Sequence, residues 1–238
     1  MGLAKLEVCL SPLLFNLYDV RNKNVVVIDI LRATSTICTA LNNGAKEVIP
    51  VTTIEECLAL KKENNILACE REGKIAEGFE HGNSPLEYTE ALIKNKTLAL
   101  TTTNGTRCIN MSIGADNIIA GSFLNLKTVC DFLIKDNKDT ILFCSGWKDQ
   151  FSLEDTLFAG AVVDAIQENF DWNNDSTFCA YSLYTSAKND LYTFVKNSSH
   201  YQRLAGHGVE KDIQFCISLN QFDILPILNT KTRSFGTN

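Results

Sequence analysis

The sequence predicts an α/β protein with three layers, in which helices cover both faces of a largely parallel or mixed sheet. From Val25 to about Phe170, short runs of β-branched and apolar residues alternate with longer segments of helical periodicity, which is typical of βα units. The 238 residues are 45% hydrophobic and 21% charged, close to ordinary soluble proteins, so a large core can form. We expect one domain over residues 1–238, and a small C-terminal subregion from about residue 171 stays open.

Six short apolar runs are the strand candidates. The first, Val25–Ile30, contains three consecutive valines and is typical of a strand buried on both faces. The others are Glu47–Val51, Ile66–Glu70, Thr97–Thr102, Asn117–Ala120 and Thr140–Cys144.

Helices are predicted in the intervals between these strands. The helix after the first strand ends near Gly44, which suits a left-handed cap. Two more helix starts fit a capping box, in which a hydroxyl and a carboxylate bind the free amides of the first turn. They are Thr53 with Glu56 and Ser84 with Glu87.

A longer helix is predicted over Leu153–Gln167, and beyond it the pattern becomes less regular. We predict helices over Phe178–Val195 and His200–Leu204, a strand over Ile213–Leu219, and a frayed polar terminus over Thr230–Asn238.

Charge and cysteine usage exclude several functional classes. A formal charge of -6 without a cluster of Lys and Arg argues against nucleic acid as a partner. No apolar run approaches the roughly 20 residues that span a bilayer, so we expect no membrane partner and a cytoplasmic protein. The nine cysteines lack CxxC pairs and the three histidines lack HExxH spacing, which makes a disulfide framework or a zinc site an unfavourable interpretation.

Polar side chains gather where the predicted strands give way to loops, and ligands of open α/β sheets bind beyond those carboxyl ends. The candidate catalytic residues are Asp29, Arg32, Glu154 and Asp155. The candidate substrate-binding residues are Thr34, Ser35, Arg71, Asn83, Ser84, Thr103, Asn104, Gly105, Thr106 and Lys148. Hydroxyls, guanidiniums and helix N-termini in one place favour a bound anion.

The acids at the same edge of the sheet would repel an anion unless a divalent cation lies between them. Asp29, Glu70 and Glu154 carry the hard oxygen ligands that suit Mg²⁺, which completes its shell with water and substrate phosphate. This combination predicts metal-dependent phosphoryl transfer, with Mg²⁺ as the cofactor and a small anionic phosphoester as the substrate.

Each of these features also has a purely structural interpretation. Asp29 and Arg32 could form a local ion pair. The TTTNGT run from Thr101 could be an ordinary Asn-Gly turn, and the two acids after Ser152 could be favoured only by the helix dipole. Among the histidines, only His81 in its glycine-rich loop is kept as a candidate ligand contact.

Four long motifs, in this order, resemble the 2-phosphosulfolactate phosphatase family. They are DILRATST from Asp29, EREGKIAEGFEHGNSP from Glu70, TTTNGT from Thr101 and GWKDQFSLED from Gly146, with a weaker match through HYQRLAGHGVEKDIQFCISLN from His200. The resemblance implies an α/β fold peculiar to that family. It also implies a Mg²⁺-dependent hydrolase that converts 2-phospho-3-sulfolactate to 3-sulfolactate and phosphate, a step on the route to coenzyme M.

On this hypothesis Asp29 is either the phosphoryl-accepting nucleophile or the principal Mg²⁺ ligand, and Arg32 holds the phosphoryl oxygens. Glu70, Glu154 and Asp155 would bind the metal or orient water. Two alternatives stay open: a phosphatase of another small phosphorylated carboxylic acid, and a non-catalytic protein that binds anions. The sequence also leaves open whether the chain forms a homo-oligomer.

Overall fold

The computed structural model describes residues 2–71, 74–102, 104–204 and 210–237, with the backbone alone for Arg71 and Leu204. Its described strands form one eleven-stranded sheet in the order β5-β4-β6-β3-β11-β10-β7-β2-β8-β1-β9. The strands are β1 (Ala4–Cys9), β2 (Asn24–Ile28), β3 (Glu47–Val51), β4 (Asn65–Arg71), β5 (Lys74–Ile75), β6 (Thr97–Thr101), β7 (Asn117–Gly121), β8 (Thr140–Cys144), β9 (Phe170–Asp171), β10 (Pro226–Asn229) and β11 (Ser234–Thr237). All six predicted strands are confirmed, with ends within two residues.

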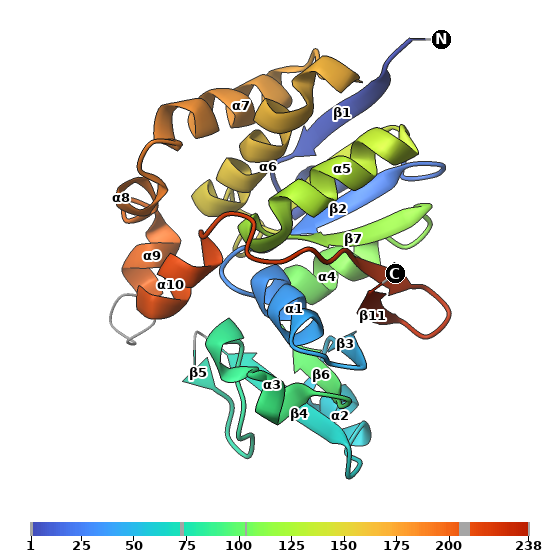
Figure 1. The fold of residues 1–238 in the computed structure, drawn as a ribbon, viewed down its shortest axis with the longest axis vertical. Helices are drawn as coiled ribbons and strands as arrows, with labels where there is room; N and C mark the ends of the chain where they lie inside the picture. The colour runs from blue at the N-terminus through green and yellow to red at the C-terminus, as the bar shows by residue number, and fades with distance from the viewer. Residues whose placement is uncertain (1, 72–73, 103, 205–209, 238) are drawn as a thin grey trace.

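Helices cover both faces of this sheet, which confirms the three-layer α/β prediction (Figure 1). The α-helices are α1 (Ala33–Asn42), α2 (Ile54–Ala59), α3 (Glu90–Ile93), α4 (Asn104–Met111), α5 (Leu126–Asp136), α6 (Leu153–Ile166), α7 (Asp175–Ala187), α8 (Leu191–Val195), α9 (Ser199–Leu204) and α10 (Glu210–Cys216). Short 3₁₀ turns are η1 (Pro12–Leu17), η2 (Pro85–Glu87), η3 (Phe123–Asn125) and η4 (Gln167–Asn169).

The sheet consists of two parallel blocks that a C-terminal hairpin joins. Strands β4, β6 and β3 run parallel in one block, and β7, β2, β8, β1 and β9 run parallel in the other. The hairpin β10–β11 pairs antiparallel with β7 on one side and with β3 on the other. The end of the chain therefore closes the gap between the blocks, beside β3 and β7 (Figure 1).

Strand β2 shows why the core lies on both sides of the sheet. Val26 and Ile28 join a hydrophobic cluster with residues of α5, α6 and α7, whereas Val25 and Val27 join a second cluster with residues of α1 and α4. Because side chains alternate along a strand, an uninterrupted apolar run buries both faces. Asp29 directly follows this buried strand, at its carboxyl end.

Three predictions about the C-terminal part are wrong. Most of Ile213–Leu219 lies in α10 or just after it, because a short apolar run does not distinguish a strand from a buried helix. The terminus expected to fray contains β11, where Phe235 is fully buried. The helix predicted over Phe178–Val195 divides into α7 and α8, since Asp190 caps a new helix by accepting a hydrogen bond from the amide of Thr193 at 3.0 Å.

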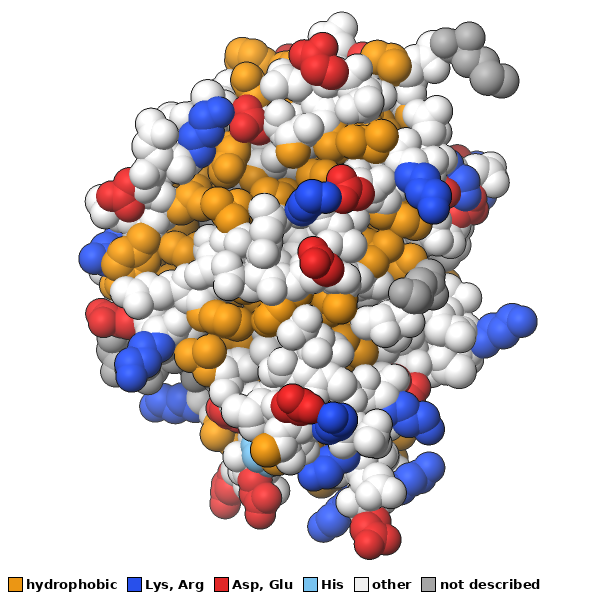
Figure 2. All heavy atoms as spheres, viewed as in Figure 1, with side chains coloured by type: hydrophobic (Ala, Val, Ile, Leu, Met, Phe, Trp, Pro, Cys, Tyr) orange, Lys and Arg blue, Asp and Glu red, His pale blue; other side chains and the backbone are white. Residues whose placement is uncertain are grey.

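The visible surface carries charges of both signs (Figure 2). On the face shown in Figure 2, lysines and arginines are mixed with aspartates and glutamates, and hydrophobic side chains gather between the helices. Within the described part of the chain, no helix has both the length and the apolar character to span a membrane.

Candidate active site

Asp29 lies where two adjacent strands of the larger parallel block, β2 and β8, end. Ile28 of β2 is in register with Cys144 of β8, and the amide of Ser145 donates to the carbonyl of Ile28 at 2.8 Å. The amide and the hydroxyl of Thr34 both donate to the carbonyl of Asp29 at 2.9 Å. These bonds fix the turn from β2 into α1 and hold the Asp29 side chain at the edge of the sheet.

The other predicted hydroxyls of this turn also have protein partners. Ser35 donates its hydroxyl to the carbonyl of Ile30 at 2.9 Å and lies 3.0 Å from the hydroxyl of Ser122. Thr34 and Ser35 are both fully buried. The structure thus gives these two residues a role in shaping the turn, and their contact with substrate stays a prediction.

Arg32 forms an ion pair with Asp212 of α10 rather than with Asp29. Both side chains are buried, and the second carboxylate oxygen of Asp212 accepts a hydrogen bond from the hydroxyl of Ser84 at 2.8 Å. Ser84 therefore does not cap the following turn, so the capping box predicted with Glu87 is wrong, although the one at Thr53 is confirmed. Three distant segments meet at Asp212.

Glu154 is a buried carboxylate that contacts His200 through only one of its two oxygens. It is 2% exposed in the first turn of α6, and its Oε1 lies 2.6 Å from Nδ1 of His200 on α9. Its Oε2 is buried and has no hydrogen-bond partner among the described residues. Burial is the largest single influence and acts to raise the pKa of Glu154, but the hydrogen bond and charge of His200, with smaller contributions from the Glu154 amide and Ser152, together lower the pKa. An ionised carboxylate with one unused oxygen is a good ligand for a cation.

Asp155 fastens the loops around the site. Its Oδ1 accepts from the amide of Ile30 at 3.0 Å, and its Oδ2 accepts from the amide of Gly146 at 3.1 Å and from the hydroxyl of Ser145 at 3.3 Å. Burial, followed by the charges of Glu154 and Asp29, raises its pKa well above the usual value. With both oxygens engaged, Asp155 is better placed to position the loops than to bind substrate.

The carboxyl group of Asp29 is influenced by the other acids predicted for the site. The pKa of Asp29 is raised to about 6: burial raises it most, the charge of His200 and the amide of Ala33 lower it, and the charges of Glu70 and Glu154 raise it. These groups therefore share one electrostatic environment. Glu70 belongs to it from the end of β4, in the other parallel block of the sheet.

The first turn of α4 approaches Asp29 through a glycine, Gly105. A Cβ atom added to Gly105 would lie 2.9 Å from Oδ2 of Asp29 and 2.9 Å from the Cβ of Ala33. Thr106 is buried, and its amide donates to the hydroxyl of Thr102 at 3.2 Å. The structure thus brings Gly105 to the site, with the partly buried Asn104 beside it at the start of α4.

The remaining predicted residues take different positions. Asn83 is 3% exposed, and its Oδ1 has no hydrogen-bond partner in the described part of the chain. Lys148 is exposed, with its Nζ 4.5 Å from the centre of the Trp147 ring. Thr103 lies outside the described residues, as does the side chain of Arg71.

The sequence interpretation missed His200, Arg203 and Asp212. His81, the histidine that it favoured, has its Nδ1 3.7 Å from a carboxylate oxygen of Glu87, whereas His200 contacts Glu154. The available signal was the run from His200, whose match to the family was the weakest of those quoted. Proximity to a motif more than 40 residues earlier cannot be read from a single sequence.

The residues fit a magnesium ion in part. Within the described ranges, no three His, Cys, Asp or Glu side chains form a group that could hold a metal, so the predicted set of Asp29, Glu70 and Glu154 is not preassembled. However, Mg²⁺ is usually bound through one or two carboxylates, with water and substrate phosphate as the other ligands. The unused Oε2 of Glu154 and the carboxylate of Asp29 can supply these two ligands.

The chain is similar to known proteins of one family. The family model for 2-phosphosulpholactate phosphatase matches residues 9–231. The chain belongs to this family. It is 44% identical over 215 residues to a probable 2-phosphosulfolactate phosphatase of Caldanaerobacter subterraneus subsp. tengcongensis, a match that covers 88% of this chain and 89% of that protein. It is 47% identical over 206 residues to a probable 2-phosphosulfolactate phosphatase of Thermotoga maritima, covering 87% and 89%.

The region shared with the 2-phosphosulfolactate phosphatase family contains the whole candidate site. It begins at β1 and extends past α10, so it includes His200, Arg203 and Asp212 as well as the four motifs. A separate hollow of about 600 Å³ lies beside β9 and is lined by Leu3, Phe170 and Trp172 among others, with none of the predicted site residues. The candidate site is therefore the edge of the sheet around Asp29 and Glu154, and its part in the chemistry stays a prediction.

Proposed function

We propose that this chain is a Mg²⁺-dependent phosphatase that hydrolyses 2-phospho-3-sulfolactate to 3-sulfolactate and phosphate. Membership of the 2-phosphosulfolactate phosphatase family and the names of its relatives support the substrate. We place the reaction in the cytoplasm, on the route to coenzyme M. Buried thiols such as Cys38 and Cys144, which suit a reducing compartment, support that location.

One observation carries the proposed metal chemistry: the Oε2 of Glu154 is buried and has no partner among the described residues, while its Oε1 is held by His200. A buried ionised oxygen without a partner is unfavourable unless a cation or a donor completes it. Asp29 is the second carboxylate in the same environment. These two residues would hold Mg²⁺, which would supply positive charge to neutralise the phosphoryl oxygens.

The chain's own residues then position the ester. Asp29 lies next to Gly105, whose missing side chain leaves the Asp29 carboxylate accessible from α4. His200 is oriented by Glu154 through Nδ1, which leaves its Nε2 to move a proton at the reacting oxygen. Asp155 holds the β2 and β8 loops at fixed separation, so that these groups meet in one geometry.

Two hydrolytic routes use Asp29. In one, an oxygen of Asp29 attacks phosphorus, the ester oxygen leaves, and water then hydrolyses the acyl phosphate. In the other, Asp29 would hold the metal, water attacks phosphorus directly, and the ester oxygen leaves. Trapping with hydroxylamine or borohydride during turnover separates them, because only the first route forms an acyl phosphate that these reagents capture.

The proposed function is tested by measuring phosphate release from phosphorylated two- and three-carbon acids, each with Mg²⁺ and with EDTA. We expect the highest kcat/KM for 2-phosphosulfolactate and complete loss of release in EDTA. A higher kcat/KM for 2-phospholactate or a phosphoglycerate would assign another substrate. Phosphate release that is unchanged by EDTA would contradict the proposed dependence on Mg²⁺. No phosphate release from any ester would indicate a non-catalytic binder.

A further inference from the structure

Arg203 is a cation beside the candidate active site whose hydrogen-bonding capacity is incompletely used by the described residues. Its guanidinium carbon lies 3.7 Å from the centre of the Trp147 ring, and its Nη1 is 3.5 Å from the hydroxyl of Ser199. Its Nη2 is buried and has no hydrogen-bond partner among the residues that the structure describes. A buried N–H without an acceptor is unfavourable, so this atom calls for an oxygen that the described chain does not provide.

The position of Arg203 relates it directly to the reacting groups. Arg203 follows His200 by three residues on α9, so the two side chains share one face of the helix, about 4.5 Å apart along its axis. His200 contacts Glu154, and the charge of Glu154 acts on Arg203 in turn. A group bound to Arg203 would therefore lie about one helical turn from the site of phosphoryl transfer.

Trp147 provides a fixed platform for this guanidinium. Trp147 and Gln150 exchange both backbone hydrogen bonds, at 3.2 and 3.0 Å, and the two residues between them have positive φ angles of 50° and 64°, as in a tight type I′ hairpin turn. Gly146, just before Trp147, donates its amide to Asp155. Trp147, on which Arg203 stacks, is thus connected through Gly146 to Asp155, the residue that positions the active-site loops.

The positive charges of Arg203 and Lys148 at the Trp147 ring favour binding of an anion. Lys148, the exposed residue predicted from the sequence to bind substrate, lies against the same Trp147 ring, with its Nζ 4.5 Å from the ring centre. Burial lowers the pKa of Arg203, although the charge of Glu154 opposes this shift, which shows a partly desolvated cation. Planar guanidiniums stacked on aromatic rings are well suited to bind two oxygens of one acid group.

We propose that Arg203, stacked on Trp147 and assisted by Lys148, binds a non-reacting acid group of the substrate and so determines specificity for doubly acidic phosphoesters. This proposal rests on the proposed function. The substrate carries a sulfonate and a carboxylate besides its phosphate, and either group can accept the unused N–H of Arg203. The catalytic groups are occupied with the phosphoryl group, so binding of a second acid one turn away aligns the ester between Asp29 and His200.

The test compares Arg203→Met with the wild type on three esters. They are 2-phosphosulfolactate, 2-phospholactate, which lacks the sulfonate, and 2-sulfoethyl phosphate, which lacks the carboxylate. We expect Arg203→Met to lower kcat/KM for 2-phosphosulfolactate about 10- to 100-fold, mainly through KM, as for the loss of a charge-assisted hydrogen bond. For the ester that lacks the group bound by Arg203, the same substitution should lower kcat/KM less than about threefold.

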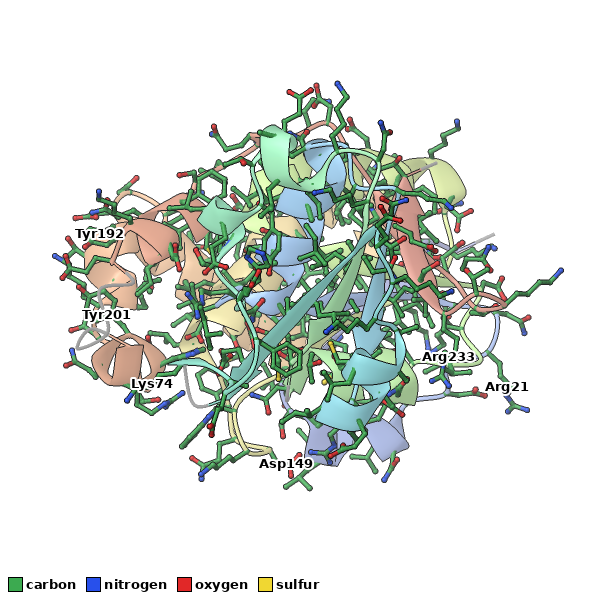
Figure 3. The ribbon with its side chains drawn as sticks, turned by 90° about the horizontal axis from the view of Figure 1, so that it is seen from below. Arg21, Lys74, Asp149, Tyr192, Tyr201 and Arg233 are labelled. Atoms are coloured by element: carbon green, nitrogen blue, oxygen red, sulfur yellow. The ribbon has the colours of Figure 1, made fainter. Side chains whose placement is uncertain are left out.

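Two more variants make the result specific. Arg203→Lys keeps the charge without the planar fork and should recover part of the affinity. Arg21→Met is the matched control, because Arg21 is exposed, pairs with Asp19, and lies on the opposite side of the molecule from Tyr201 of α9 (Figure 3). Arg21→Met should leave kcat/KM for all three esters unchanged. Equal losses on all three esters in Arg203→Met, or no loss on any, would overturn the proposal while leaving the phosphatase activity established.

A binding measurement separates this proposal from the function on which it rests. If the wild type does not hydrolyse 2-phosphosulfolactate, the proposed function fails, and calorimetry with 3-sulfolactate still tests the acid-binding role of Arg203. Binding to the wild type that weakens at least about tenfold in Arg203→Met, but not in Arg21→Met, supports the role. Equal affinity in both variants, or no binding to the wild type, contradicts it.

Discussion

The guanidinium of Arg32 is paired with Asp212, a residue 180 positions later in the chain, and both side chains are buried. Ser84 donates to the other oxygen of the same carboxylate at 2.8 Å. The first motif, the loop before η2 and helix α10 therefore meet in one polar cluster beside the active site. This arrangement orients Arg32 from the C-terminal part of the chain, although Arg32 follows Asp29 by only three residues.

Asp212→Ala is expected to destabilise the fold by about 3–5 kcal/mol, because it leaves the charge of Arg32 buried without its partner. Urea denaturation measures the free energy of unfolding. The control is Asp131→Ala, which removes an exposed acid paired with Lys127 and should cost less than about 1 kcal/mol. Similar losses of unfolding free energy in the two variants would show that the buried ion pair stabilises the fold no more than the exposed one.

Asp29→Asn is expected to lower turnover more than about tenfold and to leave the fold intact. The folded-state pKa of Asp29, about 6, lies above its ordinary value of 3.8, so the folded chain binds this proton more tightly than the unfolded chain. Its contribution to stability therefore falls as pH rises between these values and is unfavourable above pH 6. The metal-free variant should accordingly melt at a higher temperature than wild type at pH 8, with a smaller difference at pH 4.

Calorimetric melting curves and steady-state kinetics check both parts of this prediction. Asp131→Asn, an exposed acid on α5, serves as the control that should change neither quantity. Retention of more than a tenth of wild-type turnover by Asp29→Asn would remove Asp29 from the mechanism. A lower melting temperature at pH 8 would instead show that the ionised carboxylate supports the fold.

Binding of Mg²⁺ should weaken as pH falls through about 6. The ionised carboxylate of Asp29 is the form that binds a cation, and below its pKa of about 6 a proton competes for it, so affinity should fall up to about tenfold per pH unit. Calorimetric titration with MgCl₂ between pH 5 and 8 measures this affinity and the protons released. A pH-independent affinity, or no proton release at pH 6, would exclude Asp29 as a ligand.

The sequence predicted the sheet well because its strands are local signals. Strands β3 and β8 have the predicted ends, and Val25–Ile30 was correctly interpreted as buried on both faces. The hairpin β10–β11 was missed because its stability comes from insertion between β3 and β7, which no local pattern indicates. The helix α10 was missed for a related reason, since burial against the core overrides the strand-like composition of its apolar residues.

The candidate site shows the same division. Asp29, Gly105 and Glu154 could be predicted because each follows a strand or begins a helix at one edge of the sheet. His200, Arg203 and Asp212 come from α9 and α10, and only the tertiary fold brings them to that edge. Hydroxyls such as that of Ser35 were predicted to contact substrate; the structure shows the Ser35 hydroxyl bonded to the backbone of the turn, and its contact with substrate stays a prediction.

Glu154 and His200 should act as one unit in catalysis. Glu154→Gln and His200→Gln should each lower kcat/KM at least about tenfold, and the double variant should lose little more than the worse single variant, because each change breaks the same 2.6 Å contact. Kinetics of the four proteins measure the coupling. The control cycle is Asp164→Asn with Lys188→Gln, a more exposed pair between α6 and α7, which should show near-wild-type activity and additive effects. Additive losses at Glu154 and His200 would mean independent roles.

Gly105→Ala is expected to impair activity more than stability. The new Cβ would lie 2.9 Å from both Oδ2 of Asp29 and the Cβ of Ala33, so either the carboxylate or the start of α4 must move. Overpacking of this kind costs about 1–3 kcal/mol, but displacement of Asp29 should lower kcat more than about tenfold. Gly236→Ala is the control, because among the described residues, its own chain neighbours aside, no atom lies within 4 Å of its added Cβ. Phosphate-release kinetics and urea denaturation of both variants measure the two effects. Wild-type kcat in Gly105→Ala would show that the Asp29 carboxylate tolerates displacement, and would argue against its direct contact with the phosphoryl group.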